Sequence, residues 1–178
     1  KSYEALLENP KDTIEFDEAL DLKIREQRVE LGADGALLRD ENRFIVKVNF
    51  IEKILATTLA KFSNFIPEGG IWMNTQRPEW NDANNALVGN GVSMVTLNYL
   101  RRFLDFFQGV VSNSELGTVD VSEELAIFFN EILATLDGNK HLLAGKISDI
   151  DRKKVTDGVG IAGSNFRTSV YDNGFSSN

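Results

Sequence analysis

The chain has 178 residues, of which 42% are hydrophobic and 26% charged, a balance typical of one folded domain. Its net charge of −8, with no basic run longer than residues 152–154, argues against binding to nucleic acid or to an anionic membrane. No apolar stretch approaches the roughly 20 residues of a membrane span. With no cysteine and a single histidine, the sequence also predicts no metal and no cofactor, while the cellular compartment stays open.

The first part of the chain predicts one helix and one turn. Apolar residues recur at helical spacing through residues 12–31, and Gly32 follows as a typical helix end. Residues 36–47 place short apolar runs on both sides of a polar centre, which predicts a small hairpin or an extended turn.

The next segment predicts the clearest helix of the chain. Asn49 stands three residues before Glu52, a spacing typical of an N-cap with a reciprocal acid, and apolar residues follow at helical spacing until Pro67. Residues 66–91 then show neither helical nor strand periodicity. We expect them to form one long loop, which in a compact domain is usually functional.

Two further amphipathic helices are predicted from Gly91 to Gly109 and from Asp120 to Gly138. A fourth, starting at Ser148 or Asp149, contains three glycines that disfavour a helix interior, and a short helix is predicted at 164–172. Successive amphipathic helices bury their apolar stripes against one another. The sequence therefore predicts an all-α fold, in a single helical domain over residues 1–178.

The segment 72–89 combines the groups that bind sugars. It holds two tryptophans, two carboxylates, one arginine and a series of carboxamides. Indole faces stack on pyranose rings, carboxamides and Arg bind hydroxyl groups, and a carboxylic acid protonates a glycosidic oxygen. The alternative is structural, because Asn and Asp also form turns and cap helices.

The order of residues in this segment also resembles a known family. The run EWNDANNALVGNGVSMVTLNYL, from Glu79 to Leu100, resembles the Asp-Trp-Asn-Asp segment of cellobiose phosphorylases and related six-hairpin (α/α)6 glycoside-active enzymes. The similarity extends over about residues 72–107. It implies an α/α-hairpin toroid that cleaves glycosidic bonds by hydrolysis or phosphorolysis, with an oligosaccharide as substrate.

The resemblance also implies roles for individual residues. Glu79 corresponds to the general acid of the family, which has Asp there, and Asp82 corresponds to the second acid of the motif, a sugar ligand or the fallback acid. The remaining substrate-binding candidates of the segment are Trp72, Arg77, Trp80, Asn81 and Asn84.

Glycoside cleavage needs a second group, either a carboxylate base or a bound phosphate. Asp34, Asp40 and Asp157 are the candidate bases, since each lies near a glycine or in a probable turn. The phosphate-binding residues of the phosphorylases have no evident counterparts, which favours a hydrolase. A non-catalytic helical module that binds carbohydrate or a protein remains the alternative.

The length of the chain bears on the toroid. Twelve helices with their loops would need on the order of 200 residues or more. Because the chain also begins at Lys1 and not at Met, we expect a partial (α/α)6 barrel, completed by the remaining part of the same polypeptide. The pattern GVGIAG at 158–163 matches a dinucleotide-binding motif, but no buried strand precedes it and the acidic residue expected about 20 positions later is missing.

Overall fold

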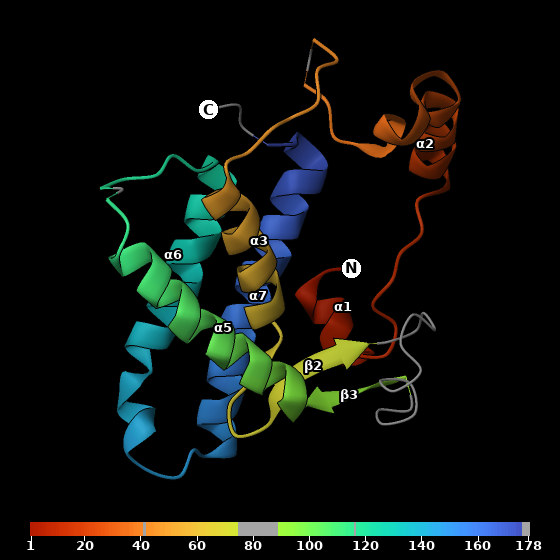
Figure 1. Cartoon of the computed structure of the whole chain (residues 1–178). Coiled ribbons are helices and arrows are strands. Elements are labelled where there is room, and N and C mark those ends of the chain that lie inside the picture. Colours follow the sequence, from red (N-terminus) through yellow and green to blue (C-terminus); the bar gives the residue numbers. More distant parts are fainter. Residues whose placement is uncertain (41, 75–88, 116, 176–178) are drawn as a thin grey trace.

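The computed structural model describes residues 1–40, 42–74, 89–115 and 117–175, and within them the chain is mainly helical (Figure 1). The α-helices are α1 (Tyr3–Glu8), α2 (Glu18–Leu31), α3 (Phe50–Phe62), α5 (Met94–Ser112), α6 (Glu123–Gly138) and α7 (Asp149–Asn173). Two 3₁₀ turns, η1 (Gly32–Ala36) and η2 (Lys140–Ala144), follow α2 and α6. None of these helices combines the length and the hydropathy needed to cross a membrane.

The core is formed by α3, α6 and α7. Its buried side chains interlock from all three helices: Leu59, Leu125, Phe128, Ile132, Val159 and Ala162. At one end of this cluster the ring of Phe128 stacks on that of Phe166, with centroids 4.7 Å apart. The helical spacing of the sequence thus correctly predicted packing of helix on helix, and the mainly helical class is confirmed. The finer assignment to a partial toroid remains a prediction.

Helix α7 runs without interruption through the three glycines that disfavour a helix interior, and it includes the stretch 164–172 that was predicted as a separate short helix. A Cβ at Gly158 would lie 2.6 Å from Cγ2 of Thr135, and one at Gly160 would lie 2.2 Å from the ring of Tyr3. At Gly163 it would lie 2.6 Å from Cβ of Ser63. The GVGIAG pattern is therefore a contact surface on α7, where α6, α1 and the end of α3 approach the backbone.

The start of α3 confirms one half of the predicted cap and corrects the other. Oδ1 of Asn49 accepts the backbone N–H of Glu52 at 2.8 Å, as expected. The Glu52 carboxylate does not return to Asn49, because its Oε1 accepts the backbone N–H of Ser122 at 3.1 Å. Glu52 is only 3% exposed. It therefore joins the start of α6 to α3, and α6 begins at Glu123, three residues later than predicted.

Helix α2 and the 3₁₀ turn η1 stand to one side of the helical body in Figure 1, whereas α1 packs on α7. Helix α2 begins at Glu18, six residues later than predicted, because Asp17 caps it by accepting the N–H of Leu20 at 2.9 Å. The predicted turn at 36–47 is confirmed by a bridge between Arg39 and Ile45.

The segment expected to be one long loop contributes a three-stranded antiparallel sheet in the order β1 (Phe65–Ile66), β2 (Gly70–Asn74) and β3 (Asn90–Ser93). In the register, Ile71 lies opposite Ser93 and Trp72 opposite Val92. The strands are too short and too rich in Gly and Asn for the alternating pattern to be visible in the sequence. The sheet connects α3 to α5 and sets the positions at which the candidate sugar-binding segment begins and ends.

Candidate functional site

The β2–β3 hairpin carries most of the residues predicted to bind and cleave sugar. Asn74, the last residue of β2, pairs with Asn90, the first residue of β3, so the chain between them leaves and returns at neighbouring positions. Six of the seven predicted site residues lie in 75–88 and therefore outside the described residues: Arg77, Glu79, Trp80, Asn81, Asp82 and Asn84. The structure thus describes the base of the candidate site, and Trp72 within it.

The base of the hairpin is tied to the segment that follows α1. Nδ2 of Asn74 donates to the carbonyl of Lys11 at 2.8 Å and to Oγ1 of Thr13 at 2.9 Å. Oδ1 of Asn74 is buried and has no hydrogen-bond partner among the described residues. These contacts hold the outgoing end of the segment in place from one side.

On the other side, the returning strand runs directly into α5. Oγ of Ser93 accepts the backbone N–H of Thr96 at 3.1 Å and caps the helix, while Oγ1 of Thr96 donates to Sδ of Met73 on the neighbouring strand at 3.1 Å. Ile71, two residues earlier, is completely buried. Both roots of the segment are therefore fixed to packed secondary structure, which gives a binding segment a defined place on the fold.

Trp72 lies on β2, two residues before the hairpin base. Its backbone N–H donates to the carbonyl of Asn64 at 2.8 Å, and its side chain is half-buried. Because strand side chains alternate, Trp72 shares a face with Asn74 and is opposite to Met73. The accessible part of this indole lies beside the root of the segment, a place from which it can contribute an apolar surface to a bound sugar.

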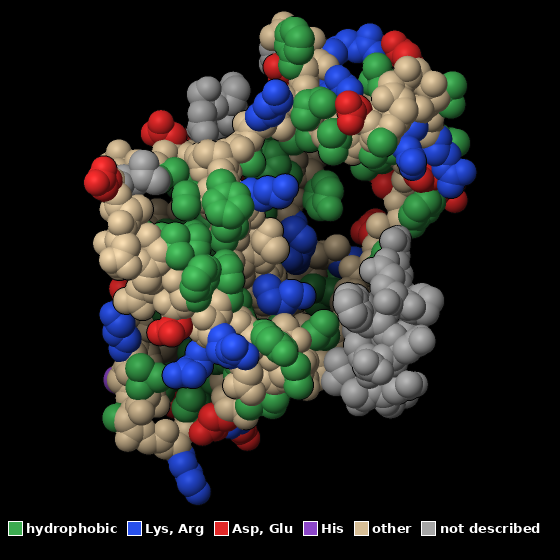
Figure 2. Space-filling model, viewed as in Figure 1, with side chains coloured by type: hydrophobic (Ala, Val, Ile, Leu, Met, Phe, Trp, Pro, Cys, Tyr) green, Lys and Arg blue, Asp and Glu red, His purple; other side chains and the backbone are tan. Residues whose placement is uncertain are grey.

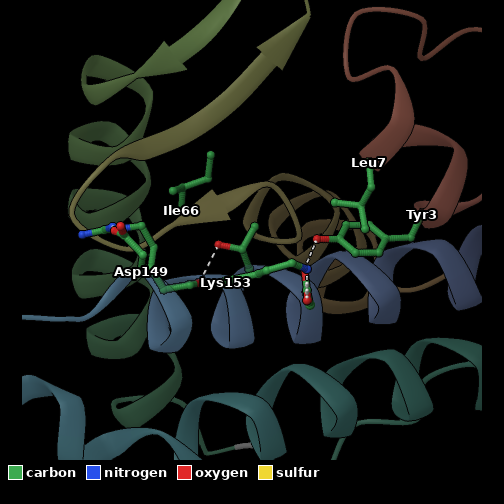
Figure 3. Close-up of a pocket in the computed structure, with 8 residues that line it drawn as sticks. Tyr3, Leu7, Ile66, Asp149 and Lys153 are labelled. Carbon is green, nitrogen blue, oxygen red and sulfur yellow. Dashed lines mark hydrogen bonds and ion pairs between the residues drawn. The ribbon is translucent and has the colours of Figure 1, made fainter.

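A concave region lies between α1, β1 and α7, away from the hairpin base, with a volume of about 290 Å³ (Figure 3). Asp157, one of the candidate bases, lines it. Its Oδ1 accepts the hydroxyl of Tyr3 at 2.8 Å and its Oδ2 pairs with the ammonium of Lys153. Burial, together with the bond to Asp157, raises the pKa of Tyr3 far above its usual range. Tyr3 therefore stays neutral and acts as a hydrogen-bond donor to Asp157, which is engaged in holding α1 on α7.

Arg152 occupies the other end of this region. Its guanidinium pairs with Glu68 at 2.6 Å and with Asp149, and its Nε donates to the carbonyl of Pro67 at 3.1 Å. The hydrogen bonds to Glu68 and then to Asp149 raise the pKa of Arg152 further. Glu68 has a positive φ of 59° in the turn between β1 and β2, a conformation that this contact helps to hold. Arg152 and Glu68 thus form an ion pair that holds the β1–β2 turn on α7.

The other candidate bases have local roles or none that the structure defines. Oδ1 of Asp40 accepts the backbone N–H of Phe44 at 2.8 Å, so it closes the turn between residues 39 and 45. Asp34 lies in η1, and its carbonyl accepts a bond from Arg39. Among the residues that the structure describes, no group of three or more His, Cys, Asp or Glu side chains is placed to hold a metal ion.

Sequence reasoning missed the residues that anchor the hairpin. Asn74 was counted only as part of the polar segment, and its bonds to residues 11 and 13 have no local signal in the sequence. Met73 and Thr96 are likewise brought together by strand pairing and not by spacing. Glu68 and Arg152 lie 84 positions apart and have no pattern that links them.

The comparisons with known proteins do not bear on the resemblance of about residues 72–107 to glycoside-active enzymes. No protein-family model matches the chain, and no curated protein matches its sequence.

Proposed function

We propose that the chain forms part of a carbohydrate-active site, in a partial (α/α)6 toroid, and that the segment between β2 and β3 binds an oligosaccharide. The observation that carries the proposal is the attachment of this segment. The segment contains residue types that bind sugars. It begins after Asn74 and ends before Asn90, which pair with each other in β2 and β3, and α5 follows β3 directly.

In the proposed chemistry, Glu79 protonates the leaving glycosidic oxygen, and Asp82 binds a sugar hydroxyl or replaces Glu79 as the acid. Trp72 and Trp80 supply apolar faces for pyranose rings, while Arg77, Asn81 and Asn84 bind hydroxyl groups. A second carboxylate or a bound phosphate completes the reaction, and the remaining part of the same polypeptide supplies it.

A non-catalytic carbohydrate-binding module is the second candidate, and one observation favours it. Two of the three carboxylates that were candidate bases, Asp40 and Asp157, are engaged in the turn and in the bonds to Tyr3 and Lys153. Binding of an oligosaccharide, with no release of new reducing ends or sugar phosphate even when the remaining part of the same polypeptide is present, would support this candidate over the enzyme.

The test is a fluorescence titration with linear β-linked and α-linked gluco-oligosaccharides. Trp72→Phe leaves Trp80 as the only indole, and Trp80→Phe leaves Trp72, so the two variants report on each side of the segment separately. We expect saturable changes with at least one sugar series, and Trp80→Ala to weaken binding by about tenfold or more, equivalent to about 1.4 kcal/mol.

The control variant is Tyr171→Ala, which removes an aromatic side chain that is 78% exposed on α7. It should bind as the unmodified chain does, and so should Glu79→Gln, because a carboxamide of the same shape still binds hydroxyl groups. Equal loss of binding in Trp80→Ala and Tyr171→Ala, or no response to either sugar series, would contradict the proposal.

A further inference from the structure

Helix α1 is attached to α7 by one residue, Tyr3. In the part of the chain that the structure describes, both hydrogen bonds that join α1 to α7 come from this residue. Its hydroxyl donates to Oδ1 of Asp157 at 2.8 Å (Figure 3), and its backbone N–H donates to Oγ of Ser164 at 3.1 Å. No residue of α1 is buried, and Figure 2 shows an opening between the helical body and the region of α2 and η1. The position of α1 therefore depends mainly on Tyr3.

The ring of Tyr3 lies against the backbone of α7 at Gly160. A Cβ at this position would lie 2.2 Å from the ring, which is closer than two carbon atoms can approach without one of them moving. Gly160 is itself buried in the middle of α7, where glycine lowers helix stability. The glycine at this position thus leaves the space that the Tyr3 ring occupies.

The turn after α1 connects this attachment to the base of the β2–β3 hairpin. The ammonium of Lys1 pairs with the carboxylate of Asp12, which ties the start of α1 to the turn. From this turn, the carbonyl of Lys11 and Oγ1 of Thr13 accept the two hydrogen bonds of the Asn74 side chain. Asn74 is the last residue of β2. A continuous series of contacts therefore leads from α7 through α1 to the hairpin base.

We propose that Tyr3 is a positioning residue for the oligosaccharide site, an inference that rests on the proposed function. By holding α1 on α7, Tyr3 keeps the two acceptors of Asn74 in place, and with them the hairpin base on which Trp72 also lies. A base that is ordered before binding loses less conformational entropy when the sugar binds. Because Tyr3 is already in place in the free chain, sugar binding should leave its surroundings unchanged.

Hydrogen exchange of the Asn74 side-chain NH₂, measured by NMR without sugar, tests the connection itself. Tyr3→Phe removes only the hydrogen bond to Asp157. We expect the NH₂ group of Asn74 to exchange about threefold to tenfold faster, the range that corresponds to the loss of one hydrogen bond. The matched control is Tyr171→Phe, which removes the same hydroxyl from a side chain that is 78% exposed on α7 and should leave this exchange unchanged.

Gly160→Ala disturbs the same contact from the side of α7. The added methyl group displaces the Tyr3 ring, while alanine favours the helix, so α7 itself should stay folded, which circular dichroism checks. We expect the same faster exchange at Asn74. In a fluorescence titration with the gluco-oligosaccharide series, both Gly160→Ala and Tyr3→Phe should bind about threefold or more weakly. A role of Tyr3 confined to α1 would change neither quantity.

The two measurements distinguish failure of this inference from failure of the proposed function. If the unmodified chain binds sugar, but Tyr3→Phe and Gly160→Ala bind it equally well or show unchanged exchange at Asn74, the positioning role is overturned and the proposed function stands. If exchange at Asn74 is faster in both variants, but the unmodified chain binds neither sugar series, the proposed function fails. The positioning role of Tyr3 then fails with it, and only the mechanical connection from α7 to the hairpin base remains.

Discussion

Gly163→Ala should lower the free energy of unfolding by roughly 2–3 kcal/mol, although alanine is the better helix former. The added methyl group would lie 2.6 Å from Cβ and 2.7 Å from Oγ of Ser63. Ser63 is 7% exposed at the end of α3, and its hydroxyl donates to the carbonyl of Ala60 at 2.9 Å. Because the obstacle is a Cβ fixed to a packed backbone, α7 must move away from α3, and chemical denaturation measures the cost.

The control for this prediction is Gly109→Ala. Gly109 lies inside α5, and a Cβ there would meet nothing within 4 Å. The substitution should raise the free energy of unfolding by about 0.5–1 kcal/mol, through helix propensity alone. If both variants changed stability in the same direction, the close approach of α7 to α3 would be wrong.

Glu52→Leu should lower the free energy of unfolding by about 2–3 kcal/mol, even though leucine has a similar size and is apolar. The substitution removes the acceptor of the Ser122 backbone N–H, and that donor is buried at the start of α6. Denaturant titrations of the two chains measure the difference.

Glu52→Gln is the comparison that isolates the hydrogen bond. Its side-chain carbonyl still accepts the N–H of Ser122, and the new NH₂ takes the place of Oε2, which has no partner among the described residues. We expect a loss of less than about 1 kcal/mol. A loss as large as that of Glu52→Leu would indicate that the negative charge, and not the hydrogen bond, stabilises the junction.

The sequence predicted the helices because their signals are local. Apolar spacing and the Asn49 cap placed α3 to within a few residues, and the same spacing located α5 and α6. The glycines of α7 were misread because helix propensity counts against glycine, while close packing on Tyr3, Ser63 and Thr135 requires it. That requirement depends on residues far away in the chain, so no local pattern could reveal it.

For the candidate site, too, the residue types are a local signal, whereas their positions depend on tertiary contacts. The residue types of 72–89 suggested sugar chemistry from composition alone, but the hairpin that presents them depends on pairing between Asn74 and Asn90 across the segment. The bond from Asn74 to Lys11 and the contact from Thr96 to Met73 are likewise products of tertiary packing. The sequence offered Asp157 as a candidate base, and only the structure shows its bonds to Tyr3 and Lys153.

The most direct measurement is a map of backbone amide NMR shifts of the labelled chain during titration with the gluco-oligosaccharide series. The account predicts saturable shifts in residues 75–88 and at the hairpin base, in Trp72, Asn74 and Asn90, with little change around Tyr3 and Arg152. Shifts confined to the region between α1 and α7, with the hairpin base unchanged, would contradict the central claim that the β2–β3 segment binds carbohydrate.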